Sequence, residues 1–207
     1  MEVALDIIEE SEDKVLLQDC SDLLYVSSFF NEKQESNFIK SCERLIRSSY
    51  EYRKWLKEVK DTLNINSCPY TEEDVNSGVS IEIHHHPLTL WDVCICCFDE
   101  LILDKGEVTS FDVAKKVMEL HFQMNVGFIP LIKSLHEKFH EGEMSIPIDW
   151  CYGNWKECYE KIVKRPEIKE KLEVHSKITL DHLKEQGLFK QIDWPTSSCK
   201  ISLIKAN

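Results

Sequence analysis

The alternation of apolar and polar residues predicts a chain that is mainly helical. Between Asn31 and Lys60, apolar residues recur close to the helical period, so we expect one long amphipathic helix with Asn31 as its N-cap. Thr89 and Ser110 are capping residues of the same kind, in front of later apolar runs. The full pattern predicts helices over residues 31–60, 90–103, 110–123, 132–140, 155–164 and 166–186.

Strand-like patterns are short and few. Residues 79–83 alternate apolar and polar side chains, which predicts a strand that leads into three consecutive histidines. Residues 127–131 are expected to form a second short strand or a tight connection, and 200–204 a last strand. The apolar stretch 23–30 is expected to form a strand or a short helix against the core. The expected fold class is therefore α+β, with helices dominating.

Composition indicates a single globular folding unit. The 207 residues are 43% hydrophobic and 30% charged, so the chain can bury a substantial core. Its nine cysteines are an odd number, which favours thiols in a reducing compartment over a disulfide framework. No apolar run approaches the roughly 20 residues of a membrane span, and Met1–Glu10 is acidic where a secretory signal is basic. We therefore expect a cytoplasmic protein with no membrane partner.

The net charge of −12 bears on the choice of partner. Proteins that bind nucleic acid through many phosphate contacts usually present a basic face. The charge therefore argues against tight, extended DNA binding. It is still compatible with a small catalytic groove in which a metal ion supplies the positive charge.

Three consecutive histidines, His84, His85 and His86, end the first predicted strand. Because successive side chains of a strand point to opposite faces, His84 and His85 share a face only if the chain turns there. This geometry suits a division of roles, in which one histidine coordinates a metal ion and its neighbour faces the bond to be cleaved as a general base.

His136 and His140 stand four residues apart on a predicted helix, which places both imidazoles on one helix face. Two such imidazoles can bind one ion, and His84 would be a third ligand. Three protein ligands leave one coordination position open, as a catalytic metal requires. A set of histidine ligands favours zinc, nickel or another transition ion over magnesium.

These residues resemble the HNH, or ββα-metal, finger of a nuclease family. The similarity rests on Glu82-Ile83-His84-His85, then Phe128-Ile129-Pro130-Leu131, and then Leu135-His136 through Phe139-His140-Glu141-Gly142. It is especially to colicin-type nucleases, in which a His-His pair on a strand is completed by H-x-x-x-H on a helix. The resemblance implies that His84, His136 and His140 are the metal ligands and that His85 is the general base.

The resemblance also implies an architecture and an activity. It implies a mainly helical domain built around the finger: an N-terminal helical region at 1–78, the finger at 79–145 with a helical insertion at about 88–124, and a C-terminal helical extension at 146–207. The implied activity is metal-dependent hydrolysis of phosphodiester bonds in nucleic acid, DNA rather than RNA. His85, neutral near pH 7, would take a proton from the attacking water while the metal neutralises the leaving oxygen. Magnesium or manganese joins zinc and nickel as a candidate ion.

The chain departs from the family pattern in three ways. Many members carry two C-x-x-C pairs that bind a structural zinc, and this chain has none at the expected places. About fifty residues separate His86 from His136, where the family usually has a short loop. Gly127 stands where the family has the asparagine that orients the base, so Asn125 is the nearest substitute. His86 becomes the base in place of His85 if the strand register is shifted by one residue.

Several further residues have two interpretations. His121 is either a fourth ligand or a partner of one, or else a partly buried helix histidine. Phosphate contact and ordinary surface solubility both explain three basic residues, Lys133, Lys138 and Arg165. A lid over the finger and a surface for stacking on a base both explain three aromatic residues, Trp150, Tyr152 and Trp155. Core packing is favoured over metal binding for Cys94, Cys96 and Cys97.

Two other functional classes fit the same residues. A non-catalytic protein can keep the finger as a metal-stapled scaffold, and the negative charge favours this alternative because an acidic protein more readily binds a basic partner. A metal-dependent hydrolase of a small phosphoester or nucleotide is the other. The His84-His85 doublet favours an enzyme, since a structural metal needs only one of the two. Size, acidity and a lone finger suit a phage or mobile-element protein, and the oligomeric state stays open.

Overall fold

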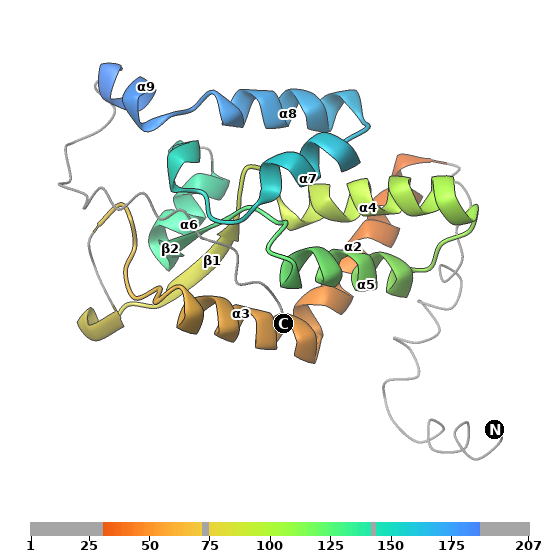
Figure 1. The fold of residues 1–207 in the computed structure, drawn as a ribbon, viewed down its shortest axis with the longest axis horizontal. Helices are drawn as coiled ribbons and strands as arrows, with labels where there is room; N and C mark the ends of the chain where they lie inside the picture. The colour runs from red at the N-terminus through yellow and green to blue at the C-terminus, as the bar shows by residue number, and fades with distance from the viewer. Residues whose placement is uncertain (1–30, 72–74, 142–143, 187–207) are drawn as a thin grey trace, which may run out of the picture.

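The computed structural model describes residues 31–71, 75–141 and 144–186. The elements expected at 23–30 and 200–204 lie outside these residues. Within them the fold is α+β and mainly helical, which confirms the predicted fold class. The strand component is one antiparallel pair, set among helices that precede, interrupt and follow it (Figure 1).

The long helix expected over 31–60 is two helices, α2 (Glu32–Ser48) and α3 (Tyr50–Thr62). Asn31 caps α2 as predicted, because its side chain accepts a hydrogen bond from the backbone of Gln34. The chain breaks at Ser49, which is extended (φ −67°, ψ 152°) and accepts a hydrogen bond from the Tyr52 backbone N–H. Serine satisfies a free helix end well, so a local cap overrides the continuous apolar period.

Two helices lie between the strands, α4 (Leu90–Lys105) and α5 (Ser110–Phe122). Thr89 begins α4 with a capping box, and the positive φ of Gly106 ends it. The cap of α5 is Thr109 and not the predicted Ser110; it also forms a capping box. α4 is buried on most sides and packs on α2, α5 and α7.

The strands are β1 (Ile81–His85) and β2 (Phe128–Ile132), each beginning slightly later in the chain than predicted. They pair antiparallel, with Ile81 opposite Ile132 and His85 opposite Phe128. A short 3-10 helix, η1 (Val75–Ser77), precedes β1, and α6 (Lys133–His140) follows β2 without a loop. The order is therefore strand, helical insertion, strand and helix.

The chain continues through η2 (Ile148–Trp150), α7 (Trp155–Ile162), α8 (Pro166–Ser176) and α9 (Leu180–Glu185). The single helix predicted over 166–186 is thus wrong. It is interrupted before Leu180, because Thr179 is extended and caps α9 with its hydroxyl oxygen. Pro166 occupies the first turn of α8, as expected from its missing N–H.

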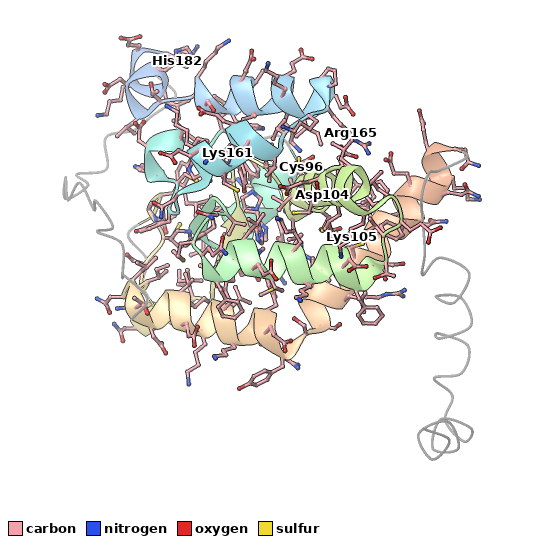
Figure 2. The ribbon with its side chains drawn as sticks, turned by 45° about the vertical axis from the view of Figure 1, so that its right-hand side comes forward. Cys96, Asp104, Lys105, Lys161, Arg165 and His182 are labelled. Atoms are coloured by element: carbon pink, nitrogen blue, oxygen red, sulfur yellow. The ribbon has the colours of Figure 1, made fainter. Side chains whose placement is uncertain are left out.

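One cluster of buried side chains joins these elements. Trp55, Tyr159 and Phe38 are among its largest fully buried members. In Figure 1, α8 and α9 run along one edge, α3 along the opposite edge, and the strand pair lies between them. At the start of α8 the guanidinium of Arg165, labelled in Figure 2, donates to both carboxylate oxygens of Asp99 at 2.7 Å and lies 2.6 Å from Glu35. Among the described residues, no helix is both long and apolar enough to cross a membrane.

Candidate metal centre

The two faces of β1 carry different chemistry. Glu82 and His84 face α6, where they contact His136. Ile83 is buried in the core, and His85 packs on Trp55 and His121. The strand alternation expected from the sequence therefore separates His84 from His85.

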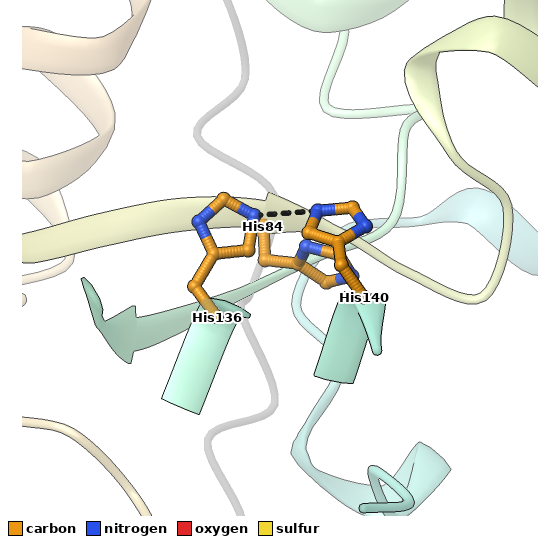
Figure 3. Close-up of side chains that lie close together, drawn as sticks. All are labelled: His84, His136 and His140. Carbon is orange, nitrogen blue, oxygen red and sulfur yellow. Dashed lines mark hydrogen bonds between the residues drawn. The ribbon is translucent and has the colours of Figure 1, made fainter. Parts of the chain in front are cut away.

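His84, His136 and His140 come together as predicted (Figure 3). Each offers one ring nitrogen, and the three nitrogens lie within 4.8 Å of one another. The Nε2 atoms of His136 and His140 are 3.0 Å apart. Two imidazole nitrogens bound to one tetrahedral zinc are separated by roughly 3.3 Å, since each Zn–N bond is about 2.0–2.1 Å. The spacing of this one pair is close to what a shared ion requires.

Glu82 orients His136. The Nδ1–H of His136 donates to Oε2 of Glu82 at 2.6 Å. In the neutral ring this leaves Nε2 unprotonated, and Nε2 is the nitrogen that faces His140. Metal-bound histidines usually donate their other ring N–H to a carboxylate or carbonyl in this way. The sequence motif contained Glu82, but the prediction gave it no role.

Burial favours the neutral form of two of the three histidines, His84 and His140. His84 is 3% exposed, and burial, reinforced by His136, holds the pKa of its imidazole far below the usual range. Burial also lowers the pKa of His140, again with help from His136. Neutral imidazole is the form that binds a metal. The Nε2 of His84 is buried and has no hydrogen-bond partner.

His85 lies on the other face of β1 in an aromatic box. Its Nε2 is 2.9 Å from Nε2 of His121, and its ring stacks with those of Tyr52 and Trp55. His121 donates through Nδ1 to the carbonyl of Val117 at 2.7 Å, so its Nε2 accepts from His85. The structure therefore does not bring His85 to the three-histidine cluster, and His121 is a buried partner of His85.

His86, the alternative base, is 1% exposed and packs its ring near Phe139 and His175. Its Nε2 is buried with no hydrogen-bond partner, as is Nδ1 of His175. Burial, with His175 beside it, lowers the pKa of His86 to about 3. His175 comes from α8, far along the chain, and is not among the residues predicted from the sequence.

Gly127 occupies its position for a steric reason. A Cβ added there would lie 2.0 Å from the carbonyl oxygen of His86, and the Gly127 N–H donates to the hydroxyl of Tyr159 at 3.0 Å. An asparagine therefore does not fit where the family pattern has one. The side chain of Asn125 instead donates to Gln123 at 3.1 Å, and the structure gives it no contact with the three-histidine cluster.

Comparison with known protein families places the chain in a family. The model of the Bacteriophage G278-like virion protein family matches residues 2–194. The chain belongs to this family. No curated protein and no solved structure matches the chain.

In this G278-like virion protein the remaining candidates mostly serve packing. Trp150 packs against Tyr70, and Tyr152 stacks on Phe128. Arg165 forms ion pairs with Asp99 and Glu35, so its guanidinium is already occupied and is a poor candidate for phosphate contact. Lys133 and Lys138 are exposed on α6, and the cysteines predicted to pack are buried, namely Cys94, Cys96 and Cys97.

Proposed function

We propose that this chain is a component of a phage particle. Within the chain, one divalent transition metal ion, zinc in the first place, joins α6 to β1. The ligands are His84 on the strand and His136 and His140 on the helix. The observation that carries the proposal is the convergence of their ring nitrogens within 4.8 Å, with Glu82 holding His136 in the required tautomer.

The structure of α6 supports a stapling role. None of its eight residues is buried, and its N-cap, Ile132, provides no side-chain hydrogen bond. Leu135 and Phe139 pack against the core only in part, and a short helix without a capping side chain gains little stability of its own. An ion that joins His136 and His140 to the buried His84 adds a strong attachment to this packing and to the Glu82–His136 hydrogen bond.

Membership of a virion protein family supports the particle assignment. The net charge of −12 agrees with a role in which the chain meets other proteins rather than a long nucleic-acid duplex. The position of His85 also favours a structural metal. His85 lies on the face of β1 that points away from the cluster, where it forms a hydrogen bond with His121.

The first test measures metal content. The full chain, dialysed against zinc and then freed of excess, should retain about one zinc per chain by elemental analysis. His140→Ala should lose it, whereas His182→Ala, a change at an exposed histidine of α9 labelled in Figure 2, should retain it. Zinc contents that do not differ between these variants would remove the basis of the proposal. The particle assignment is tested by mass spectrometry of purified particles of a phage that encodes the chain, in which the chain should be detected.

The second candidate is an HNH-type nuclease. The chain order of β1, β2 and α6, with histidine ligands on the first strand and on the helix, is the order of the ββα-metal finger, and three protein ligands leave a position for water or substrate. In this candidate the long connection between the strands is the helical insertion of α4 and α5.

Cleavage assays separate the two candidates. Plasmid DNA, RNA and nucleotides are incubated with the chain and zinc, nickel, magnesium or manganese. Cleavage that His140→Ala slows at least a hundredfold and His182→Ala leaves unchanged favours the nuclease. Retained zinc with no cleavage under any metal favours the staple. If a nuclease is found, His85→Asn tests whether the family's base acts from the buried face.

A further inference from the structure

We propose that the N-terminal segment of this chain, residues 13–24, docks as an amphipathic helix in the apolar groove between α2 and α5. The groove has a volume of about 770 Å³. It is lined by the C-terminal end of α2 and by one face of α5, with Leu45, Phe111, Met118 and Phe122 as the main apolar side chains.

The groove exists because α5 has two apolar faces. Val113, Val117 and Leu120 face the core and are buried. Phe111, Met118 and Phe122 follow a second helical stripe, spaced seven and four residues apart, that lines the groove. Phe111 is 61% exposed and Phe122 is 44% exposed, whereas Met118 between them is buried and forms the floor of the groove. Two exposed aromatic side chains on one helix face are typical of a surface that receives another apolar element.

The N-terminal segment has the matching pattern. Apolar residues stand at 16, 17, 20, 23 and 24, which would share one side of a helix; Asp22 would fall on the other side together with the apolar Val15, and Asp19 between the two sides. The family match begins at residue 2, so this segment belongs to the sequence that defines the family.

The connection to α2 is long enough for the segment to reach the groove. The groove residues of α2 begin at Leu45, fourteen residues beyond the cap at Asn31, or about 21 Å along the helix. Residues 25–30 span up to about 24 Å between residue 24 and Asn31 when extended. Covalent attachment also gives the segment an effective concentration of about millimolar, which favours it over a second copy or another protein.

Photo-crosslinking in the full chain tests this assignment. Phe122 is replaced by the photoreactive residue p-benzoylphenylalanine, and the same residue at Leu103, which is 76% exposed on α4, serves as the control. We expect a product with the mass of one chain, whose crosslinked peptides join position 122 to residues 13–24, at a yield at least five times that of the control.

A second variant keeps the test independent of the probe. Leu16→Asp with Leu23→Asp should reduce the crosslink at position 122 at least fivefold while circular dichroism still shows the helical content of the parent. A crosslink between two chains, a crosslink to residues 187–207, or a yield no higher than the control would each overturn the proposal. None of these results depends on whether the histidine cluster binds a metal.

Discussion

The Nδ1–H of His136 donates to Oε2 of Glu82 across 2.6 Å. This hydrogen bond joins β1 to α6 and determines which nitrogen of His136 faces His140. The carboxylate also balances the positive charge that an ion would bring to a site with three neutral ligands. Glu82 therefore belongs to the proposed centre even though it is not placed as a ligand.

Removing the charge of Glu82 should weaken metal binding without disturbing the fold. Glu82→Gln keeps the size of the side chain but no longer offers a carboxylate to His136, and we expect zinc affinity to fall about 10- to 100-fold. Competition with a chromophoric chelator measures the affinity. Glu141→Gln, at an exposed position beside α6, is the matched control. Equal affinities in the two variants would show that the Glu82 contact does not contribute to binding.

Metal binding should order α6. In the proposed staple, zinc links His136 and His140 to His84, so opening of the helix requires release of the ion. We expect amide hydrogen exchange over Lys133–His140 to slow at least tenfold on adding zinc, with little change over α4. His140→Ala should abolish the zinc effect. Unchanged exchange in the wild-type chain with zinc bound would contradict a stapling role.

Stability should fall in mild acid because His121 is buried in the neutral form. Burial lowers the pKa of His121 to about 4, against the opposing hydrogen bond to Val117. The unfolded chain binds this proton below about pH 6.5, whereas the folded chain resists it, so stability is full above pH 6.5 and declines as the pH falls towards 4. Over this pH range, the lowered pKa of His121 alone reduces the free energy of unfolding by about 3 kcal/mol.

Urea unfolding at pH 7, 5.5 and 4.5, in the presence of a chelator, measures this decline. His121→Phe should be less stable than the wild type at pH 7, since His85 loses the acceptor of its Nε2–H. Its free energy of unfolding should nevertheless fall less steeply with decreasing pH, because unfolding of this variant takes up one proton fewer. The same slope in both proteins would exclude His121 as a source of acid sensitivity.

Gly127 should not tolerate a side chain. The Cβ of alanine would overlap the carbonyl oxygen of His86, which cannot move without disturbing the strand pair. We expect Gly127→Ala to lower the free energy of unfolding by about 3 kcal/mol, as in an overpacked core. Asn125→Ala, two residues away with a half-exposed side chain, should change it by less than about 0.5 kcal/mol. Denaturant titration of both variants gives the comparison.

Spacing alone was enough to predict part of the centre. The helical period fixes His136 and His140 to one face, and strand alternation separates His84 from His85. The same alternation also places Glu82 on the side of His84, which is the signal that could have identified its role. The family pattern assigned a base to His85, but only the packing of Trp55 and His121 shows where that side chain lies.

The sequence was less informative where local caps and distant contacts decide the structure. Ser49 and Thr179 each begin a new helix inside an apolar pattern that predicts a continuous one, because a side-chain hydrogen bond at the N-cap outweighs the period. The place of His175 beside His86 depends on how α8 crosses the molecule. No regularity along the chain encodes that contact.

His84 and His85, the two histidines at the end of β1, contribute little to fixing the register of the strand. If the strand slipped by one residue, one imidazole would replace the other on each face, and the set of side chain types at those positions would hardly change. Glu82 and Ile83 have no such redundancy, because a slip would bring a carboxylate into the apolar core and an isoleucine out towards His136. Correct pairing of β1 therefore depends on Glu82 and Ile83 more than on the histidines, and a slip of the strand would misplace the proposed metal ligands without altering any of them.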